Sequence, residues 1–119
     1  MKDTTLHPLV HAWFIKEYGE ASLVQKKAWP LIADGANVLA LAPTGSGKTL
    51  AAFLVALSRF ADGSWPAEEL SVVYISPLKA LNEDIRRNLL EPVHELSHYF
   101  NEQNAHFPTI RVETRSGDT

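Results

Sequence analysis

The residues from Ala42 to Thr49 form a glycine-bearing loop whose residue types suit the binding of phosphate groups. Ala42 stands where the general phosphate-loop pattern has its first glycine. Gly45 and Gly47 let the chain wrap tightly, so that backbone N–H groups point into one concavity. Lys48 would reach the β- and γ-phosphates of a nucleotide and stabilise the transition state, and the Thr49 hydroxyl would hold Mg²⁺. The predicted nucleotide-binding residues are Ala42, Pro43, Thr44, Gly45, Ser46, Gly47, Lys48 and Thr49.

The alternative interpretation of this segment is a Gly/Ser turn with a solvated lysine. The neighbouring elements favour the phosphate loop, because residues 37–41 predict a strand buried on both faces and residues 49–60 predict an amphipathic helix. The apolar residues of that helix form one stripe: Leu50, Phe53, Leu54, Leu57 and Phe60. A dinucleotide-binding fold is disfavoured, because the glycines do not follow the G-x-G-x-x-G spacing.

Two helices are predicted before the loop. Residues 9–18 carry Val10, Trp13 and Phe14 at helical spacing, and Gly19 ends that helix. Ser22 begins a second helix, with Gln25 placed to complete a capping box. Pro30 is expected to interrupt or restart this helix, and Asp34-Gly35 to end it.

After the loop, residues 70–75 and 110–113 predict two further strands, and a helix is expected from about Lys79. Ile85 and Leu89 would face inward on that helix, which Pro92 would kink or split. The resulting strand–helix–strand–helix–strand order predicts an α/β layer fold with a parallel sheet. Right-handed crossovers would then bring the loops after the strands to one edge of the sheet.

Composition narrows the classes of function. The 119 residues have 11 Lys and Arg against 14 Asp and Glu, a net charge of -3, so a uniformly basic nucleic-acid coat is excluded. The absence of cysteine excludes disulfide scaffolds and cysteine nucleophiles. The longest apolar run, residues 50–57, falls far short of a membrane span. We therefore expect no membrane partner and a cytoplasmic location.

The phosphate loop, followed by Leu50-Ala51-Ala52-Phe53, resembles the first motor domain of superfamily 2 helicases, most closely the large-helicase-related (Lhr) branch of the DEAD/DEAH-box group. Gln25 lies 23 residues before Lys48, as in the Q motif of that family. The resemblance implies that Gln25 reads the adenine of ATP through its amide, which donates and accepts at once. Trp13 or Phe14 would supply the aromatic ring that stacks on the base.

Two further segments carry the resemblance. Residues 76–82 resemble motif Ia, and residues 115–119 resemble the Arg-Thr-Gly-Asp-Thr segment of Lhr-type enzymes, with Ser116 replacing the threonine. In the family these segments hold a single strand of DNA or RNA, and a helix N-terminus with Lys79 suits a phosphate anchor. The implied nucleic-acid contacts are Pro77, Lys79, Ala80, Asn82, Arg115, Gly117 and Asp118.

The resemblance implies a partial RecA-like P-loop NTPase domain over residues 1–119, a three-layer α/β/α fold around a parallel sheet, with residues 1–36 as its Q-motif helical region. The cofactors would be ATP and Mg²⁺. No Asp-Glu-x-His follows, so the water-activating glutamate is absent from these residues, as is the second RecA-like domain. The chain is expected to be the ATP-binding portion of an ATP-dependent helicase or translocase that by itself binds nucleotide and hydrolyses poorly.

Other functions stay open at this point. A generic P-loop ATPase or kinase, or a non-catalytic nucleotide-binding module, would carry the same loop. His94-Glu95-Leu96-Ser97-His98 matches the H-E-x-x-H pattern of zinc metalloproteases. A third ligand at the usual spacing is missing, since position 104 is Asn, and His106 or Glu113 would have to serve.

Overall fold

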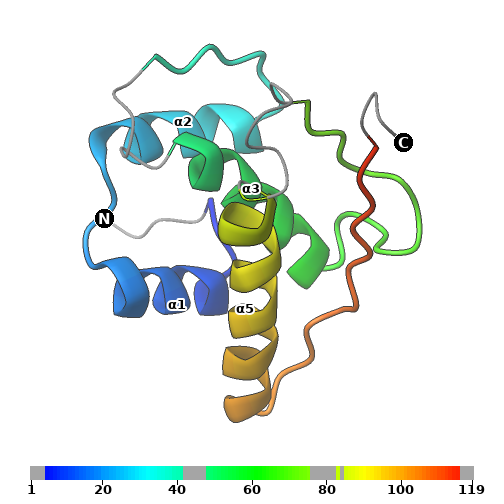
Figure 1. Cartoon of the computed structure of the whole chain (residues 1–119). Helices are drawn as coiled ribbons and strands as arrows, with labels where there is room; N and C mark the ends of the chain where they lie inside the picture. Colours follow the sequence, from blue (N-terminus) through cyan, green and yellow to red (C-terminus); the bar gives the residue numbers. More distant parts are fainter. Residues whose placement is uncertain (1–4, 42–47, 76–82, 84, 116–119) are drawn as a thin grey trace.

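The computed structural model describes residues 5–41, 48–75, 83 and 85–115. In chain order its helices are α1 (Pro8–Tyr18), α2 (Leu23–Ala33), α3 (Lys48–Ala61), the π-helix η2 (Arg86–Leu90) and α5 (Glu91–Glu102). Helix α3 contacts α2, η2 and α1, and α1 also contacts α5. Figure 1 shows α3 at the centre of this arrangement, between α2 and α5. The helix that begins at Lys48 is therefore the element around which the others pack.

Helix α1 begins and ends at residues whose chemistry suits those positions. The His7 side chain caps it, because its Nδ1 accepts a hydrogen bond from the Leu9 N–H at 3.0 Å. Gly19, with a φ of 78°, ends it and donates its N–H to the Ile15 carbonyl at 2.8 Å. A positive φ favours glycine, which has no Cβ to clash. The prediction of a helix that Gly19 ends is confirmed.

Helix α2 begins with the predicted capping box. Ser22 Oγ accepts from the Gln25 N–H at 3.3 Å, and Gln25 Oε1 accepts from the Ser22 N–H at 2.8 Å. The expectation that Pro30 interrupts this helix is wrong, because α2 continues to Ala33. Pro30 is exposed and lies in the last turn of α2. Its missing N–H removes one helical hydrogen bond there, and its ring does not disturb the packing of the core, so the helix continues.

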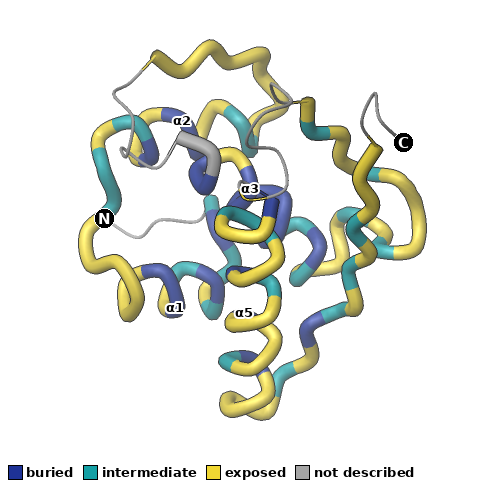
Figure 2. Tube along the Cα trace, viewed as in Figure 1, coloured by how far each residue is buried: buried dark blue, intermediate teal, exposed yellow. Residues whose placement is uncertain are grey.

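Helix α3 carries most of the core. All five residues of the predicted stripe are buried, and the neighbouring Ala51, Val55, Ala56 and Ser58 are buried too. Ser58 Oγ accepts from the His7 N–H at 3.1 Å, and Arg59 Nη2 donates to the Ala33 carbonyl at 3.0 Å. Figure 2 shows buried positions on α3 and on the sides of α1, α2 and α5 that face it. The position of α3 is thus fixed by packing on several sides and by two polar contacts.

The helix after residue 83 has an irregular turn. Pro92 has no N–H, so it cannot donate to the carbonyl four residues earlier. The N–H of the preceding residue, Glu91, donates to the Arg86 carbonyl, which is five residues back rather than the usual four. This widened turn is η2, and α5 continues from it with Pro92 in its first turn. The expectation that Pro92 would kink or split the helix is met only as this irregular turn, because α5 follows η2 without a break. Ile85 is buried as expected, whereas Leu89 is only half-buried.

The three predicted strands are not confirmed. None of the described residues at 37–41, 70–75 and 110–113 belongs to a β-strand, and Figure 1 shows these segments as irregular chain around the helices. Leu39, Leu70 and Ile75 are 83%, 85% and 88% exposed. A strand exists only when its backbone groups pair with a neighbour, and that long-range condition is not set by a local apolar run.

Candidate nucleotide and nucleic-acid site

The phosphate loop leads into the N-terminus of α3. Residues 42–47, which include Ala42, Pro43, Thr44, Gly45, Ser46 and Gly47, lie outside the described part of the chain, as do the side chains of Lys48 and Thr49. The backbone of Lys48 and Thr49 forms the first turn of α3, as the phosphate-loop pattern predicts. The first N–H groups of a helix lack internal partners and carry partial positive charge, so this end of α3 suits an anion.

Gln25 lies on the helix that packs against α3. It is only 5% exposed, so it is not a glutamine of the solvent-facing helix surface. The hydrogen bond from Ser22 to Oε1 holds the side chain in the first turn of α2. A buried, hydrogen-bonded amide has a defined orientation, which is what the reading of a base requires.

The aromatic residues suggested for base stacking are in the core instead. Trp13 is 2% exposed and Phe14 is 1% exposed. The Phe14 ring packs edge-on against Trp29 at a centroid distance of 5.2 Å, and Trp13 packs edge-on against Tyr18 at 5.8 Å. Both rings are buried in the core rather than exposed for stacking, so that assignment is wrong. The helical spacing of Trp13 and Phe14 reflects the packing of α1 against the core, which is a more common reason for such spacing than ligand binding.

The predicted nucleic-acid residues are mostly outside the described residues. Pro77, Lys79, Ala80 and Asn82 of the motif Ia segment lie there, as do Gly117 and Asp118. Arg115 is described: its side chain is 77% exposed, lies 3.8 Å from Glu113 and donates to the Thr114 carbonyl at 3.0 Å. An exposed guanidinium held this loosely is accessible to a phosphate.

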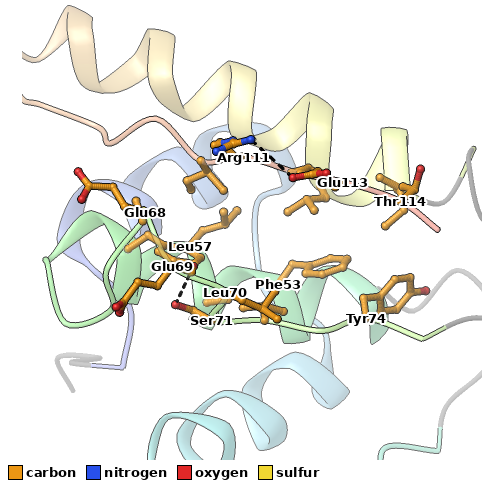
Figure 3. Close-up of a pocket in the computed structure, with 18 of the residues that line it drawn as sticks. Phe53, Leu57, Glu68, Glu69, Leu70, Ser71, Tyr74, Arg111, Glu113 and Thr114 are labelled. Carbon is orange, nitrogen blue, oxygen red and sulfur yellow. Dashed lines mark hydrogen bonds and ion pairs between the residues drawn. The ribbon is translucent and has the colours of Figure 1, made fainter.

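A pocket of about 310 Å³ lies beside α3, and sequence reasoning did not anticipate it. Figure 3 shows Phe53 and Leu57 of α3 on one side, with Leu70 and Tyr74 beside them and Arg111 and Glu113 across the opening. The Phe53 and Tyr74 rings lie 5.1 Å apart, and Arg111 and Glu113 form an ion pair at 3.6 Å. Residues from two predicted strand segments, 70–75 and 110–113, line this pocket. The apolar residues of these segments are the sequence feature that could have indicated a shared apolar surface.

The H-E-x-x-H segment does not form a metal centre in the described part of the chain. His94, Glu95 and His98 lie on α5 without being buried, and His98 Nε2 lies 3.4 Å from Glu102. No group of three or more His, Cys, Asp or Glu in the described ranges is placed to hold a metal ion, and neither His106 nor Glu113 joins the segment. The zinc-protease interpretation is therefore wrong for these residues, since catalytic zinc needs three protein ligands.

Burial and nearby carboxylates raise the pKa of Tyr18, a phenol beside the same helix. Partial burial raises the pKa of Tyr18 above its ordinary value of 10.0, and the carboxylates of Glu95, Glu17 and Glu91 raise it further. We expect the difference between the ultraviolet titration curves of the native chain and Tyr18→Phe to have its midpoint above 10.0. Glu95→Gln should move that midpoint down without removing the shift, because burial is the larger cause. A midpoint at or below 10.0 would contradict this.

None of the helices in the described ranges is long and apolar enough to cross a membrane.

Comparison with known proteins places the chain in a family. The model of the DEAD/DEAH box helicases matches residues 22–109. The chain is 44% identical over 112 residues to the Lhr helicase/probable uracil glycosylase of Mycolicibacterium smegmatis, covering 93% of this chain and 7% of that protein. It is also 44% identical to the ATP-dependent helicase Lhr-Core of Saccharolobus solfataricus, covering 96% of this chain and 13% of that protein.

A solved structure agrees with these relatives. The chain superposes on the Mycobacterium smegmatis helicase Lhr bound to ssDNA and AMP-PNP with a TM-score of 0.85 and 41% identity, covering 98% of this chain and 14% of that one. The likeness supports a RecA-like fold. The chain thus spans only between 7% and 14% of the length of these proteins. With the family model matching most of its residues, the chain belongs to the DEAD/DEAH box helicase family and is similar to its Lhr members.

Proposed function

We propose that this chain is the ATP-binding front portion of an ATP-dependent nucleic-acid helicase or translocase. One observation carries the proposal: α3 begins at Lys48, at the end of the phosphate-loop sequence, and packs against the helix that holds the buried Gln25. The residues expected at the two ends of a nucleotide are therefore on adjacent helices. Membership of the DEAD/DEAH box family supports ATP as that nucleotide.

In this proposal each end of the nucleotide has its own group of residues. Backbone N–H groups of residues 42–47 and the N-terminus of α3 bind the phosphates, Lys48 stabilises the charge that develops on them, and Thr49 holds Mg²⁺. Gln25 reads the adenine. The AMP-PNP in the related Lhr structure supports an adenine nucleotide as the ligand.

The nucleic-acid strand would bind at a second group of residues. Pro77, Lys79, Ala80 and Asn82 would hold its phosphate backbone from one loop, and Arg115, Gly117 and Asp118 from another. The ssDNA in the related structure supports a single strand as the ligand. Such contacts rest on loop backbones and a few basic side chains, which is compatible with a net charge of -3.

The finer architecture is part of the same proposal. We place residues 37–41, 70–75 and 110–113 as parallel strands of a three-layer α/β/α fold over residues 1–119, with residues 1–36 as the Q-motif helical region. The exposed apolar side chains of residues 37–41 and 70–75 support this, because such segments are stable as strands only between two layers. A second RecA-like domain would close over the nucleotide, in a cytoplasmic protein without a membrane partner.

Hydrolysis would depend on residues that this sequence does not contain. The 119 residues have no Asp-Glu-x-His to ligate Mg²⁺ and activate water. We expect the purified chain to bind a fluorescent ATP analogue in the presence of Mg²⁺ and to hydrolyse ATP at the rate of buffer alone, with or without single-stranded DNA or RNA. Turnover well above that background, or no nucleotide binding, would contradict the proposal.

The translocase part needs its own measurement. A chain extended to include an Asp-Glu-x-His sequence should hydrolyse ATP faster when single-stranded nucleic acid is added. Indifference to both DNA and RNA would leave a generic P-loop ATPase and reject a nucleic-acid motor.

A further inference from the structure

We propose that Glu113 restrains the binding of a nucleic-acid strand by holding Arg111 and Arg115, and that Arg111 is a phosphate contact beside Arg115. This inference rests on the proposed function, in which Arg115 binds the strand. It goes further in adding a second arginine to that contact and in giving the carboxylate between the two arginines an opposing role.

Glu113 is the shared partner of the two arginines. Arg111 Nη2 lies 3.6 Å from Glu113 Oε2, and Arg115 Nη2 lies 3.8 Å from Glu113 Oε1. Each arginine therefore faces its own oxygen of one carboxylate. Figure 3 shows the pair of Arg111 and Glu113 at the opening of the pocket, on the segment that follows α5.

Exposure alternates along this segment. Arg111 and Glu113 are exposed, whereas Ile110 and Val112 are half-buried, and Ile110 packs against the core. Side chains two residues apart lie on the same side of an extended chain. The segment thus presents a charged row to solvent, in which two positive charges, on Arg111 and Arg115, flank one negative charge.

Both ion pairs of Glu113 are easily exchanged. A hydrogen bond between charged arginine and carboxylate groups is about 2.7 to 2.9 Å long, and Arg86 Nη2 lies 2.7 Å from Glu83 Oε2 in this way. The two pairs of Glu113 are longer, and the side chains of Arg111, Glu113 and Arg115 are 80%, 65% and 77% exposed. Exposed ion pairs contribute little to stability. Both guanidinium groups can therefore leave the carboxylate for a stronger partner.

A nucleic-acid strand is such a partner. Its phosphates accept the same forked hydrogen bonds as a carboxylate, and each phosphate that a protein cation neutralises also releases condensed counterions. Binding requires Arg111 and Arg115 to exchange one anion for another, and it brings phosphates close to Glu113. The lost ion pairs and the repulsion between like charges both oppose binding, so Glu113 should lower the affinity for the strand.

Glu113→Gln isolates the charge of the carboxylate. Glutamine has nearly the same shape but forms no ion pair, so both arginines become free for the strand. We expect this variant to bind a fluorescein-labelled oligodeoxythymidylate of about twelve nucleotides about three- to tenfold more tightly than the native chain at low salt. The gain should shrink as the salt concentration rises, because salt screens exposed charges. Fluorescence anisotropy of the labelled strand measures both effects, and an oligouridylate of the same length extends them to RNA.

Arg111→Gln tests the second phosphate contact. It should weaken the binding of the same strand about three- to tenfold. The slope of the logarithm of affinity against the logarithm of salt concentration should become shallower by about 0.7, the value for one phosphate contact on a single strand. In a chain that carries both Arg111→Gln and Arg115→Gln, the gain from Glu113→Gln should become smaller, because no guanidinium is left to release.

An exposed ion pair elsewhere in the chain provides matched controls. Lys26 Nζ lies 3.2 Å from Glu20 Oε2, and neither residue belongs to a proposed site. Glu20→Gln changes the net charge by as much as Glu113→Gln does, and Lys26→Gln by as much as Arg111→Gln does. Both controls should bind the strand within about twofold of the native affinity. Urea unfolding of all the variants should give the native midpoint, since every replaced side chain is exposed.

The outcomes separate the two proposals. A native chain that binds neither single-stranded DNA nor single-stranded RNA overturns the proposed nucleic-acid site and this inference together. If the native chain binds the strand but Glu113→Gln binds it no more tightly than Glu20→Gln does, this inference alone is overturned. Native affinity and salt slope in Arg111→Gln would also overturn it, as would an undiminished gain from Glu113→Gln in the chain without both arginines.

Discussion

Replacing Lys48 with alanine is expected to weaken the binding of Mg·ATP by about 10- to 100-fold. Lys48 begins α3, where the helix N-terminus already favours an anion, and its ammonium would add a charge-assisted contact to the β- and γ-phosphates. Such contacts to charged groups contribute about 1.5 to 3 kcal/mol, which gives this loss of affinity. Titration of the purified chain with a fluorescent ATP analogue measures it.

Lys27→Ala is the matched control for that variant. Lys27 is exposed on α2 and belongs to no predicted site, so removing its charge should leave the affinity within about twofold. If Lys48→Ala bound nucleotide as tightly as Lys27→Ala, the phosphate-loop assignment would be rejected.

The second large effect is expected for Phe100→Ala, which should lower the free energy of unfolding by about 3 to 5 kcal/mol. Phe100 is 1% exposed, and its ring centroid lies 5.2 Å from that of His7 and 5.0 Å from that of Phe107. One side chain therefore joins α5 to the start of α1 and to the segment that follows α5. Such a loss is a large fraction of the stability of a small domain. Urea unfolding followed by circular dichroism measures it.

Leu23→Ala provides the comparison for this variant. Leu23 is 68% exposed at the start of α2, so its truncation should change the unfolding free energy by about 0.5 kcal/mol or less. Equal unfolding midpoints for Phe100→Ala and Leu23→Ala would contradict the description of the core.

The helices could be predicted from sequence because their determinants are local. The stripe from Leu50 to Phe60 repeats at helical spacing within one segment, and Ser22 with Gln25 completes a capping box over three residues. The end of α1 at Gly19 is set by a single residue that tolerates a positive φ. Each of these features depends only on residues that are close together in the sequence, within a single helix or at its end.

The wrong or unconfirmed predictions concern features that depend on distant parts of the chain. Residues 70–75 have the apolar pattern of a strand, but pairing requires a partner that the pattern does not specify. Trp13 and Phe14 have the right type for base stacking, and only the packing of α1 shows that they are buried. A proline such as Pro30 predicts a break in α2, although its effect depends on how near the helix end lies.

The widened turn at η2 also acts as a correction of helical register. From Ile85 onward, the core-facing positions are Ile85, Leu89, Pro92, Leu96 and Phe100, of which Leu89 is half-buried. The average spacing of these positions is slightly longer than the 3.6 residues of one α-helical turn. In a regular α-helix, Phe100 would therefore be rotated away from the face that Ile85 occupies. The π turn takes up the extra fraction of a residue and keeps both ends of the helix aimed at the core. The same proline that disturbs the backbone at this point thereby keeps the two halves of the helix in phase with each other.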